Sequence, residues 1–490
     1  MRSSPFLGLS RLVVILLAAA PALAEDDPHA RAKSIYAASC ASCHGADLRG
    51  GGASSLADGL WLYGSGSQIR RNIREGIPEA GMPAYGDALS DADFRALAAY
   101  MQAVQQEVTP EPPPLPTLVP TRDYDLRVTP FATGLATPWA IAFPDPASAD
   151  TALITERPGR LRIVTNGKLH PKPIAGTPAV ATVGQGGLLD VVVDPDYANN
   201  GWIYLSYSHA TKPAAKGQRP HAMTRVVRGR IRDHTWTDQE VLFEARPEHY
   251  VQPRVHFGTR FAFDPEGHLY FSIGDRGKGS SAQNLELPNG KIHRIHRDGS
   301  IPADNPFVSG HGNAYPSIFT YGNRNPQGLA THPATGKIWS TEHGPLGGDE
   351  LNLLKSGVNY GWPEISYGQN YSGTVMTEFT AKPGFEQPIL YWKPSIAVCG
   401  LTFYTGQQFP RWRNNLFAGG LSYETVRRLV VVDQRVIYQE ELLKNLGRVR
   451  DVQEGPDGAI YVVLNSPDTV IRLSHDATHH GAGDGNEVNP

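Results

Sequence analysis

Short apolar runs separated by polar turns fill the chain from residue 121 to residue 477. Several segments repeat one order: a small-residue turn, an alternating apolar run, an Asp-Pro or Pro-Asp-Gly turn, and a second run. Runs of this length predict β-strands, and recurrence at roughly 50 to 75 residues suits four-stranded blades. Six copies, one of them looser, therefore predict a six-bladed β-propeller rather than a β-sandwich or two β-domains. The paired runs are 139–143 with 152–155, 188–193 with 202–207, 260–263 with 269–273, 328–330 with 337–341, 401–404 with 416–419, and 449–453 with 459–464.

The first part of the chain has a helical pattern instead. Residues 30–39 contain neither Gly nor Pro, and Ser90 stands where the N-cap of a later helix is expected. We therefore expect a small all-α domain ahead of the all-β propeller. Apolar side chains of the later helix recur at helical spacing, at Phe94, Leu97, Ala98 and Met101.

Changes in composition mark the boundaries between these parts. Residues 110–120 include six prolines, which favour an extended, semi-rigid spacer. The last residues are rich in His, Gly and Asp and poor in apolar side chains, which predicts disorder. The predicted organisation is a signal peptide at 1–24, a helical domain at 25–107, a linker at 108–120, a propeller at 121–477 and a disordered tail at 478–490.

The N-terminus predicts export. Arg2 is followed by an apolar run at 12–20 and by Ala22-Leu23-Ala24, the arrangement of a signal peptide cleaved after Ala24. The run is short for a bilayer span, so an uncleaved anchor is the weaker alternative. The sequence has no other long apolar segment. We predict a periplasmic protein without stable membrane insertion.

Charge and cysteine content narrow the function further. The net charge is −3 and the basic residues are scattered, which argues against a nucleic-acid partner. Three cysteines are too few for a disulfide framework. Cys399 stands alone, and we expect it to be a small buried hydrophobic side chain rather than a nucleophile.

The other two cysteines belong to Cys40-Ala41-Ser42-Cys43-His44, the C-x-x-C-H attachment motif of c-type haem. Cys40 and Cys43 can bond to the two vinyl groups of one haem, and His44 can bind its iron. A zinc site would need two more nearby ligands, and a thioredoxin-type dithiol would need a βαβ setting. Both explain the motif less well. The whole domain resembles a class I cytochrome c.

The second axial ligand of the haem iron is expected on the loop before the last helix. Met82 lies there, and its thioether is a soft ligand that raises the haem potential. Met101 is the competitor, but its place on the apolar helix face indicates core. Ligation by His44 and Met82 leaves no open position on the iron, so we expect this haem to relay electrons rather than bind oxygen.

The propeller region resembles the soluble sugar dehydrogenases that use pyrroloquinoline quinone (PQQ) and the related aldose sugar dehydrogenases. The matching stretches keep the family's order across nearly the whole region, and GNRNPQGLA and NYGWP are the most specific. The stretches are Gly184–Leu189, His256–Arg260, Ser272–Asp275, Gly290–Ile292, Asp298–Pro302, Gly322–Gly328, Glu342–Pro345, Asn359–Pro363 and Arg448–Asp451.

The resemblance implies roles for individual residues. His256 would be the base that removes the proton of the substrate hydroxyl, because histidine titrates near working pH. Asp275 would orient and stabilise its imidazole, and Gln185 would lie near quinone and substrate. Guanidinium groups suit the carboxylates of PQQ and the charge that develops on the reduced quinone. The implied cofactor contacts are Arg324, Asn325, Arg448 and Arg450, of which Arg324 also serves the chemistry.

The two arginines of the last stretch add an argument from the residues. Arg448 and Arg450 alternate along a predicted strand, so both should face one side. A single inward arginine could be structural, but two of them together with Arg324 indicate an anion. The resemblance also implies that the backbone carbonyls of Gly344 and Pro345 hold Ca²⁺, which takes oxygen ligands and would polarise the quinone.

The sequence departs from the family at several cofactor and substrate positions. The acid that precedes the base in glucose-oxidising members is Val255 here, and a lysine that contacts the cofactor aligns near Ser422. A glutamine beside the calcium loop is His343. These changes put glucose specificity and tight cofactor binding in question. The aromatic that covers the cofactor falls near Leu390, with Tyr391 and Trp392 as adjacent substitutes.

The preferred hypothesis is a PQQ- and Ca²⁺-dependent dehydrogenase of aldose sugars or related alcohols that passes electrons to its own haem c. A cytochrome, a quinone pool or an oxidase would then accept them. A lactonase-like calcium hydrolase is an alternative; it predicts clustered axial carboxylates and explains neither the haem nor the arginines. A haem carrier with a non-catalytic binding propeller is a second alternative, which Val255 and Ser422 keep open.

Overall fold

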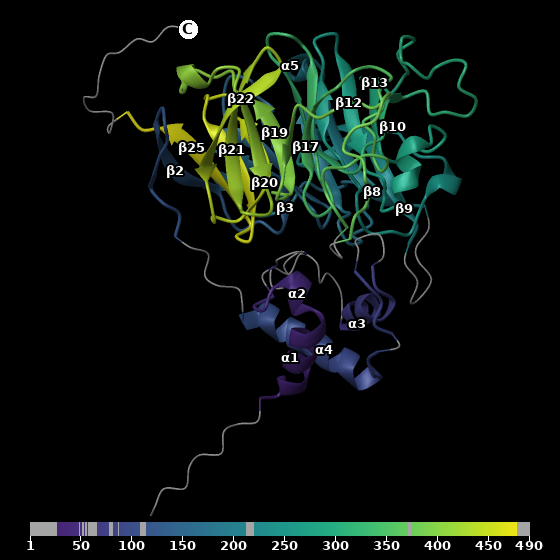
Figure 1. Ribbon diagram of the computed structural model, residues 1–490. Helices are drawn as coiled ribbons and strands as arrows, with labels where there is room; N and C mark the ends of the chain where they lie inside the picture. Colours follow the sequence, from purple (N-terminus) through teal and green to yellow (C-terminus); the bar gives the residue numbers. More distant parts are fainter. Residues whose placement is uncertain are drawn as a thin grey trace, which may run out of the picture.

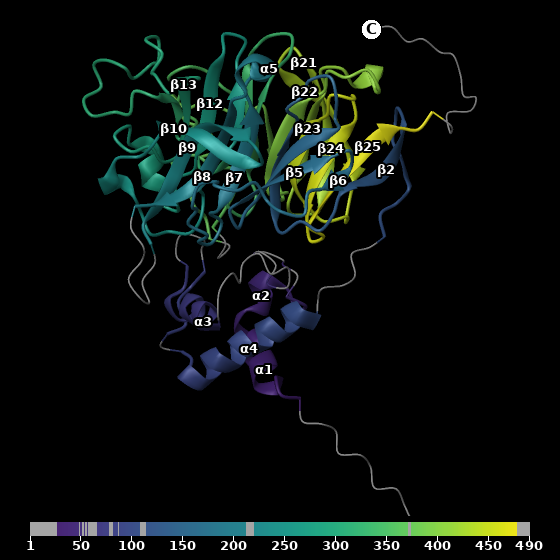
Figure 2. The ribbon, with the colours of Figure 1, turned by 180° about the vertical axis from the view of Figure 1, so that it is seen from behind.

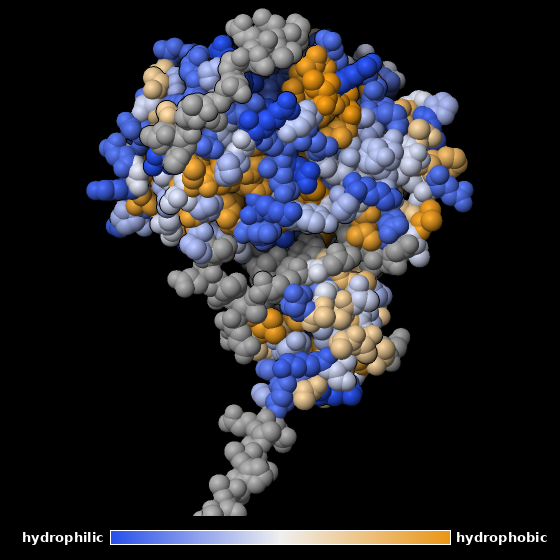
Figure 3. Space-filling view, turned by 60° about the vertical axis from the view of Figure 1, so that its left-hand side comes forward, coloured by the Kyte–Doolittle hydropathy of each residue, from blue (hydrophilic) through white to orange (hydrophobic). Residues whose placement is uncertain are grey.

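The molecule consists of a small helical domain and a large propeller, which form two distinct lobes (Figures 1 and 3). The predicted signal peptide and the predicted C-terminal tail lie outside the described residues. Among the described helices, none is long and apolar enough to cross a membrane. The computed structural model describes residues 27–48, 50, 53, 56, 66–77, 82–86, 88–107, 114–211, 220–370 and 374–477.

The helical domain is built around one apolar cluster. The predicted first helix is confirmed with its exact bounds, and Ser90 begins the last one, because its Oγ accepts the Asp93 N–H at 3.2 Å. Met101 is 3% exposed and belongs to the core, as its place on the helix indicated. The helices are α1 (Ala30–Ser39), α2 (Ala41–His44), α3 (Gly66–Glu75) and α4 (Asp91–Glu107).

The described part of the propeller forms six antiparallel sheets, and each predicted pair of runs forms the two innermost strands of one blade. The first two blades contain β3 (Pro138–Ala142), β4 (Thr151–Glu156), β5 (Arg160–Thr165) and β6 (Lys168–Leu169), then β7 (Leu188–Val193), β8 (Ile203–Ala210), β9 (Ala222–Arg232) and β10 (Thr235–Phe243). The short helix α5 (Tyr197–Asn200) joins β7 to β8.

The remaining blades follow the same order from the axis outward. The third and fourth contain β11 (Phe261–Phe263), β12 (His268–Ile273), β13 (Lys291–His296) and β14 (Ile318–Tyr321), then β15 (Pro326–Thr331), β16 (Ile338–Glu342), β17 (Asp349–Leu353) and β18 (Leu390–Trp392). The fifth contains β19 (Val398–Phe403), β20 (Leu416–Gly420), β21 (Thr425–Val432) and β22 (Arg435–Leu443).

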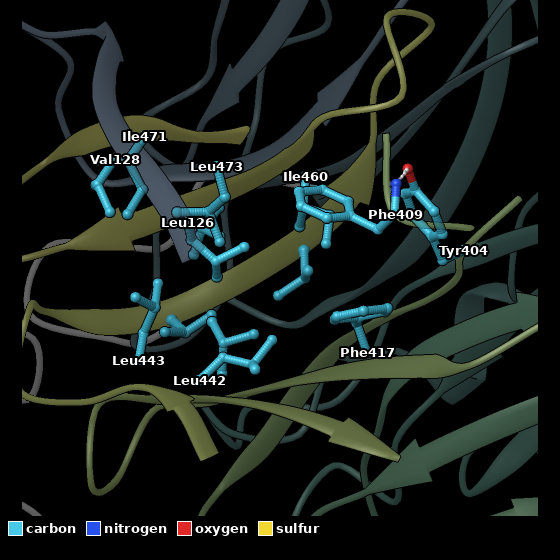
Figure 4. Packing of buried hydrophobic residues seen from close by; sticks show 14 of the residues in the cluster. Leu126, Val128, Tyr404, Phe409, Phe417, Leu442, Leu443, Ile460, Ile471 and Leu473 are labelled. Atoms are coloured by element: carbon cyan, nitrogen blue, oxygen red, sulfur yellow. Dashed lines mark hydrogen bonds between the residues drawn. The ribbon is translucent and has the colours of Figure 1, made fainter. Parts of the chain in front are cut away.

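The ring is closed by strands from both ends of the propeller sequence. The sixth blade has the order β1-β2-β25-β24-β23, and Leu126 of β2 pairs with His475 of β25. Figure 4 shows the leucine, isoleucine and phenylalanine side chains that fill the space between this blade and the fifth. Each such side chain stabilises the fold by about 1.5–3 kcal/mol when it is fully buried. The strands are β1 (Leu118–Pro120), β2 (Asp125–Ala132), β23 (Arg448–Glu454), β24 (Ile460–Asn465) and β25 (Thr469–His475).

The propeller begins earlier than the predicted boundary at residue 121. Leu118–Pro120, which the sequence assigned to the linker, forms the edge strand β1 and pairs with β2. Leu115 also packs against the core of the closing blade. An edge strand tolerates proline because one side of its backbone needs no ladder partner, and the proline-rich composition therefore concealed this strand.

Candidate functional site

The predicted site residues converge on one face of the propeller. Gln185, His256 and Arg324 lie just before the innermost strands β7, β11 and β15, and Asp275 follows β12. In an antiparallel blade the start of the first strand and the end of the second lie at the same edge. The loop that contains Gly344 joins β16 to β17 and therefore reaches this face as well.

His256 and Asp275 form a buried pair. Nδ1 of His256 lies 2.6 Å from Oδ1 of Asp275, and the two residues are 6% and 1% exposed. The backbone of His256 has a φ of 53°, which is sterically costly for a residue with a Cβ. Gln185 holds this backbone in place, because its Oε1 accepts the His256 N–H at 2.8 Å.

The surroundings of this pair set its protonation. Burial lowers the pKa of His256, and the Arg324 guanidinium lowers it further against the opposing effect of Asp275. Burial acts to raise the pKa of Asp275, but the facing imidazole and Arg324 lower it on balance. At neutral pH the pair is therefore a neutral imidazole and an ionised carboxylate. With Nδ1–H donated to Asp275, Nε2 carries the lone pair that a base requires.

Trp362 completes the support of Asp275. Its Nε1–H donates to Oδ2 of Asp275 at 2.7 Å, and its ring centroid lies 5.2 Å from the Arg324 guanidinium carbon. The carboxylate thus has one oxygen on the imidazole and the other on the indole, which fixes both rings. Trp362 lies in the NYGWP stretch, but residue pattern alone gave it no role, because its partner is 87 positions away in the chain.

The arginines supply positive charge beside the pair. Arg324 is 4% exposed and donates from Nη1 to the carbonyls of His343 at 3.1 Å and Gly344 at 2.7 Å. Arg450 is half-buried and donates to Gln327 Oε1 at 3.4 Å and to Cys399 Sγ at 3.5 Å. These acceptors are uncharged. Burial lowers the pKa of Arg450, and neighbouring arginines add to that effect, so an anion here would be stabilised.

The donor set fits an anionic cofactor such as PQQ. Nε2 of His343 is buried and has no hydrogen-bond partner within the described residues. Burial, followed by Arg324 and Arg450, places the pKa of His343 well below its usual value. Together, a neutral imidazole and two guanidinium groups provide donors for carboxylate and quinone oxygens. His343 replaces the family glutamine, so the departure keeps a polar side chain at that position.

The two remaining predicted cofactor contacts, Asn325 and Arg448, have different surroundings. Asn325 is 2% exposed, and its Oδ1 accepts from the Gly258 N–H and from Gln327, so it supports the loop behind the base. Arg448 and Arg450 are both half-buried, and Val449 between them is buried. A register shift between Val449 and Asp451 interrupts the ladder at Arg450. Such a bulge re-aims a side chain at the rim of a sheet.

The aromatic substitutes proposed for the cofactor cover have different surroundings. Trp392 is 5% exposed and belongs to the core between the fourth and fifth blades. Tyr391 stacks on Tyr367, with ring centroids 3.9 Å apart and an interplanar angle of 11°. The aromatic side chain that contacts the His256–Asp275 pair is Trp362.

A second cluster of buried charge joins the innermost strands of three blades. Arg260 is 3% exposed; its Nη1 lies 3.0 Å from Asp190 and 3.3 Å from Asp451. Its Nη2 also donates to the Arg450 carbonyl at 2.6 Å. A calcium hydrolase would use axial carboxylates of this kind as metal ligands, but here both form ion pairs with an arginine. Spacing in the sequence could not reveal this cluster, because Asp190 lies in β7, Arg260 immediately before β11, and Asp451 in β23.

The haem motif forms one helical turn. The N–H groups of Cys43 and His44 both donate to the Cys40 carbonyl, at 3.1 and 2.9 Å. Residues three apart on a helix share a face, so both thiols are presented to the same side. Cys40 belongs to the core of the helical domain, and Met82 packs against the same core. The two thiols, the imidazole and the thioether fit a c-type haem.

Comparisons with known proteins agree with both halves of this description. Residues 135–472 match the family model described as glucose/sorbosone dehydrogenase. Residues 27–101 match the family model of subunit III of cbb3-type cytochrome c oxidase. The chain is 42% identical over 334 residues to aldose sugar dehydrogenase YliI of Escherichia coli, a match that covers 67% of this chain and 87% of that protein.

Solved structures show the same propeller. The soluble aldose sugar dehydrogenase of Escherichia coli in its apo form matches with a TM-score of 0.66 and 38% identity, over 72% of this chain and 100% of that one. The PQQ-bound form of aldose sugar dehydrogenase from Streptomyces coelicolor matches with a TM-score of 0.57 and 25% identity, over 73% of this chain and 100% of that one.

Proposed function

Because the chain belongs to the glucose/sorbosone dehydrogenase family and carries a cytochrome c domain ahead of the propeller, we propose that it oxidises aldose sugars or related alcohols and delivers the electrons to its own haem c. The buried His256–Asp275 pair beside Arg324 and Arg450 carries this proposal. It combines a neutral base with guanidinium groups that donate hydrogen bonds to uncharged atoms. Alcohol oxidation by PQQ needs both a proton acceptor and positive charge.

The side chains divide the work between proton and charge. Bound PQQ would supply a two-electron acceptor and bound haem c a one-electron acceptor. Nε2 of His256 takes the proton of the substrate hydroxyl. Nδ1–H of His256 remains hydrogen-bonded to Asp275, whose carboxylate stabilises the imidazolium that forms. Arg324 and Arg450 would hold carboxylate and quinone oxygens of that cofactor and would stabilise the negative charge that develops there. Gln185 keeps the base in its strained backbone conformation.

Calcium is a separate part of the proposal. Oxygen donors suit Ca²⁺, but the Gly344 carbonyl already accepts a hydrogen bond from Arg324 at 2.7 Å. A carbonyl oxygen has two lone pairs, so it could bind a cation as well as this guanidinium. If Ca²⁺ binds, the Gly344 and Pro345 carbonyls would hold it, and it would polarise the quinone.

The cell compartment and the final acceptor follow from the haem. We propose a periplasmic location, where c-type haem is attached, with the predicted signal peptide at residues 1–24 as the export signal. A Met/His-ligated haem passes single electrons onward, so a second cytochrome, a quinone pool or an oxidase would accept them.

The test uses the full-length protein with its haem attached. The protein is incubated with PQQ, with or without Ca²⁺, and mixed with a panel of aldoses and simple alcohols while haem absorbance is followed. We expect the haem to be reduced only when both PQQ and a substrate are present. If no substrate reduces either the haem or an added dye, the dehydrogenase proposal fails and a non-catalytic propeller replaces it.

A further inference from the structure

The helical domain touches the propeller at the face that carries the base. In both views it lies against one face of the propeller (Figures 1 and 2). Nη2 of Arg254 donates a hydrogen bond to Oδ1 of Asn72 on α3 at 3.0 Å. Asn72 is only 6% exposed. A polar helix side chain with so little exposure and a partner in the other domain lies inside an interface, not on a free surface.

Arg254 belongs to the loop that positions the base. Its backbone carbonyl accepts the Gln185 N–H at 2.8 Å, and Gly184 packs so tightly against it that any Cβ there would clash. On the other side, Nε of Arg276 donates to the Val255 carbonyl at 3.2 Å. The side chain that reaches the helical domain is therefore held firmly, two positions before His256.

The contact is just as firmly connected to the haem motif. Asn72 is followed by Ile73, which is 3% exposed and belongs to the same apolar core as Cys40. Met82 packs against that core too. The Arg254–Asn72 hydrogen bond therefore joins the loop of the base to a helix whose next residue belongs to the core that contains Cys40.

We propose that α3 docks the cytochrome domain onto the active-site face, and that the Arg254–Asn72 hydrogen bond holds the haem in position for electron transfer within the chain. The inference rests on the proposed function. Oxidation of one substrate gives two electrons and two protons, whereas one ferric haem accepts one electron. The haem must therefore pass the first electron to an external one-electron oxidant before it accepts the second, so it is reduced and reoxidised twice for each substrate oxidised.

The test changes Asn72 and leaves the propeller intact. Asn72→Lys places a second cation against Arg254, whereas Asn72→Asp offers it a carboxylate. Ala99→Lys is the matched control, because it adds the same charge to an exposed position on α4. Each full-length, haem-containing variant is examined without PQQ by small-angle X-ray scattering, and with PQQ and an aldose by stopped-flow haem absorbance and by reduction of a small soluble dye.

We expect Asn72→Lys to increase the radius of gyration and to slow haem reduction about tenfold or more, because like charges now face each other in the interface. Dye reduction should stay at the wild-type rate, because the propeller is unchanged. Asn72→Asp should keep fast haem reduction but make it sensitive to salt, and Ala99→Lys should match the wild type.

The docking proposal is overturned if Asn72→Lys leaves both the scattering curve and the haem reduction rate unchanged, or if Ala99→Lys slows reduction equally. Failure of the proposed function has a different signature, because the wild-type protein would then reduce neither dye nor haem. The scattering comparison would still decide the docking question in that case, since it needs no PQQ and no substrate.

Discussion

The described part of the propeller contains one cluster of buried charge around Arg260 and another around Arg324 and Arg450, and the two differ in the partners of their arginines. Arg260 faces two carboxylates, Asp190 and Asp451, within 3.3 Å, and burial raises the pKa of Asp190 to about 7. The cluster therefore comes close to neutrality by itself. Arg324 and Arg450 instead donate to backbone carbonyls, an amide and a thiol. In the first cluster the buried charge is balanced locally and joins blades, whereas in the second the guanidinium groups bond to neutral atoms and can still hold an anionic ligand.

The largest expected effect concerns His256, the proposed base, which together with Arg324 and Arg450 we call the ligand-binding cluster. His256→Ala should lower substrate-dependent dye reduction about 10²- to 10⁴-fold, because the hydroxyl proton loses its acceptor. Binding of PQQ, measured by titration, should persist. His268→Ala is the matched control: His268 also pairs with an aspartate, Asp264, at 2.8 Å, but it lies at the opposite end of β12 from Asp275. Equal losses in both variants would refute the assignment of the base.

Mutation of the balanced cluster, formed by Arg260, Asp190 and Asp451, should lower the stability of the protein. Arg260→Met leaves two buried carboxylates without their cation, which should lower the free energy of unfolding by about 3–5 kcal/mol, measured by urea denaturation. Arg297→Met removes an arginine that pairs with Asp194 at 2.9 Å but is 42% exposed in its side chain, and should cost no more than about 1 kcal/mol. A stable Arg260→Met variant would show that this cluster does not hold the blades together.

Loss of an arginine from the ligand-binding cluster should weaken cofactor binding without lowering stability. Arg450→Gln should weaken PQQ binding about 10- to 100-fold, since hydrogen bonds to charged groups contribute roughly 1.5–3 kcal/mol. The same change should leave the PQQ-free protein as stable as the wild type or more so, because it removes an unbalanced charge. Arg427→Gln, in an outer-strand ion pair with Glu441, should alter neither quantity. Loss of stability without loss of PQQ affinity would make Arg450 structural.

The smallest expected effect is a displacement of the pH profile. Because burial and Arg324 lower the pKa of His256, the neutral imidazole should persist below the usual histidine range, and kcat/KM should fall only as the pH drops through that lowered value. Asp275 raises the pKa of His256, so the residual activity of Asp275→Asn should show its acid limb at still lower pH. An acid limb displaced to higher pH would contradict the assigned charge states.

The fold was predictable to the level of blades because the two strands of each predicted pair lie close together in the sequence. The run 188–193 reproduces β7 and the run 30–39 reproduces α1. Strand β1 was missed because proline signals a linker, whereas an edge strand can accept it. Proline content therefore locates a domain boundary only to within the length of an edge strand, here Leu118–Pro120.

The site was predictable only in part. A resemblance to a family could point to His256 and Asp275, and the structure brings them to 2.6 Å. It could not point to Arg254 or to the role of Trp362, because their partners lie in another domain or in another blade. Contacts between distant segments depend on blade order and on docking, and neither is written in the local spacing of residues.

The strand that closes the ring also sets an order of assembly. Arg127 of β2 bonds to Asp476, a residue 349 positions later in the chain, so the ring remains open until the last blade has been synthesised. The helical domain is complete by residue 107, and domains nearer the N-terminus generally fold first. The haem-attachment motif is thus ready for its cofactor while the propeller is still an open array of blades. The haem domain would then mature before the propeller that could reduce it has folded.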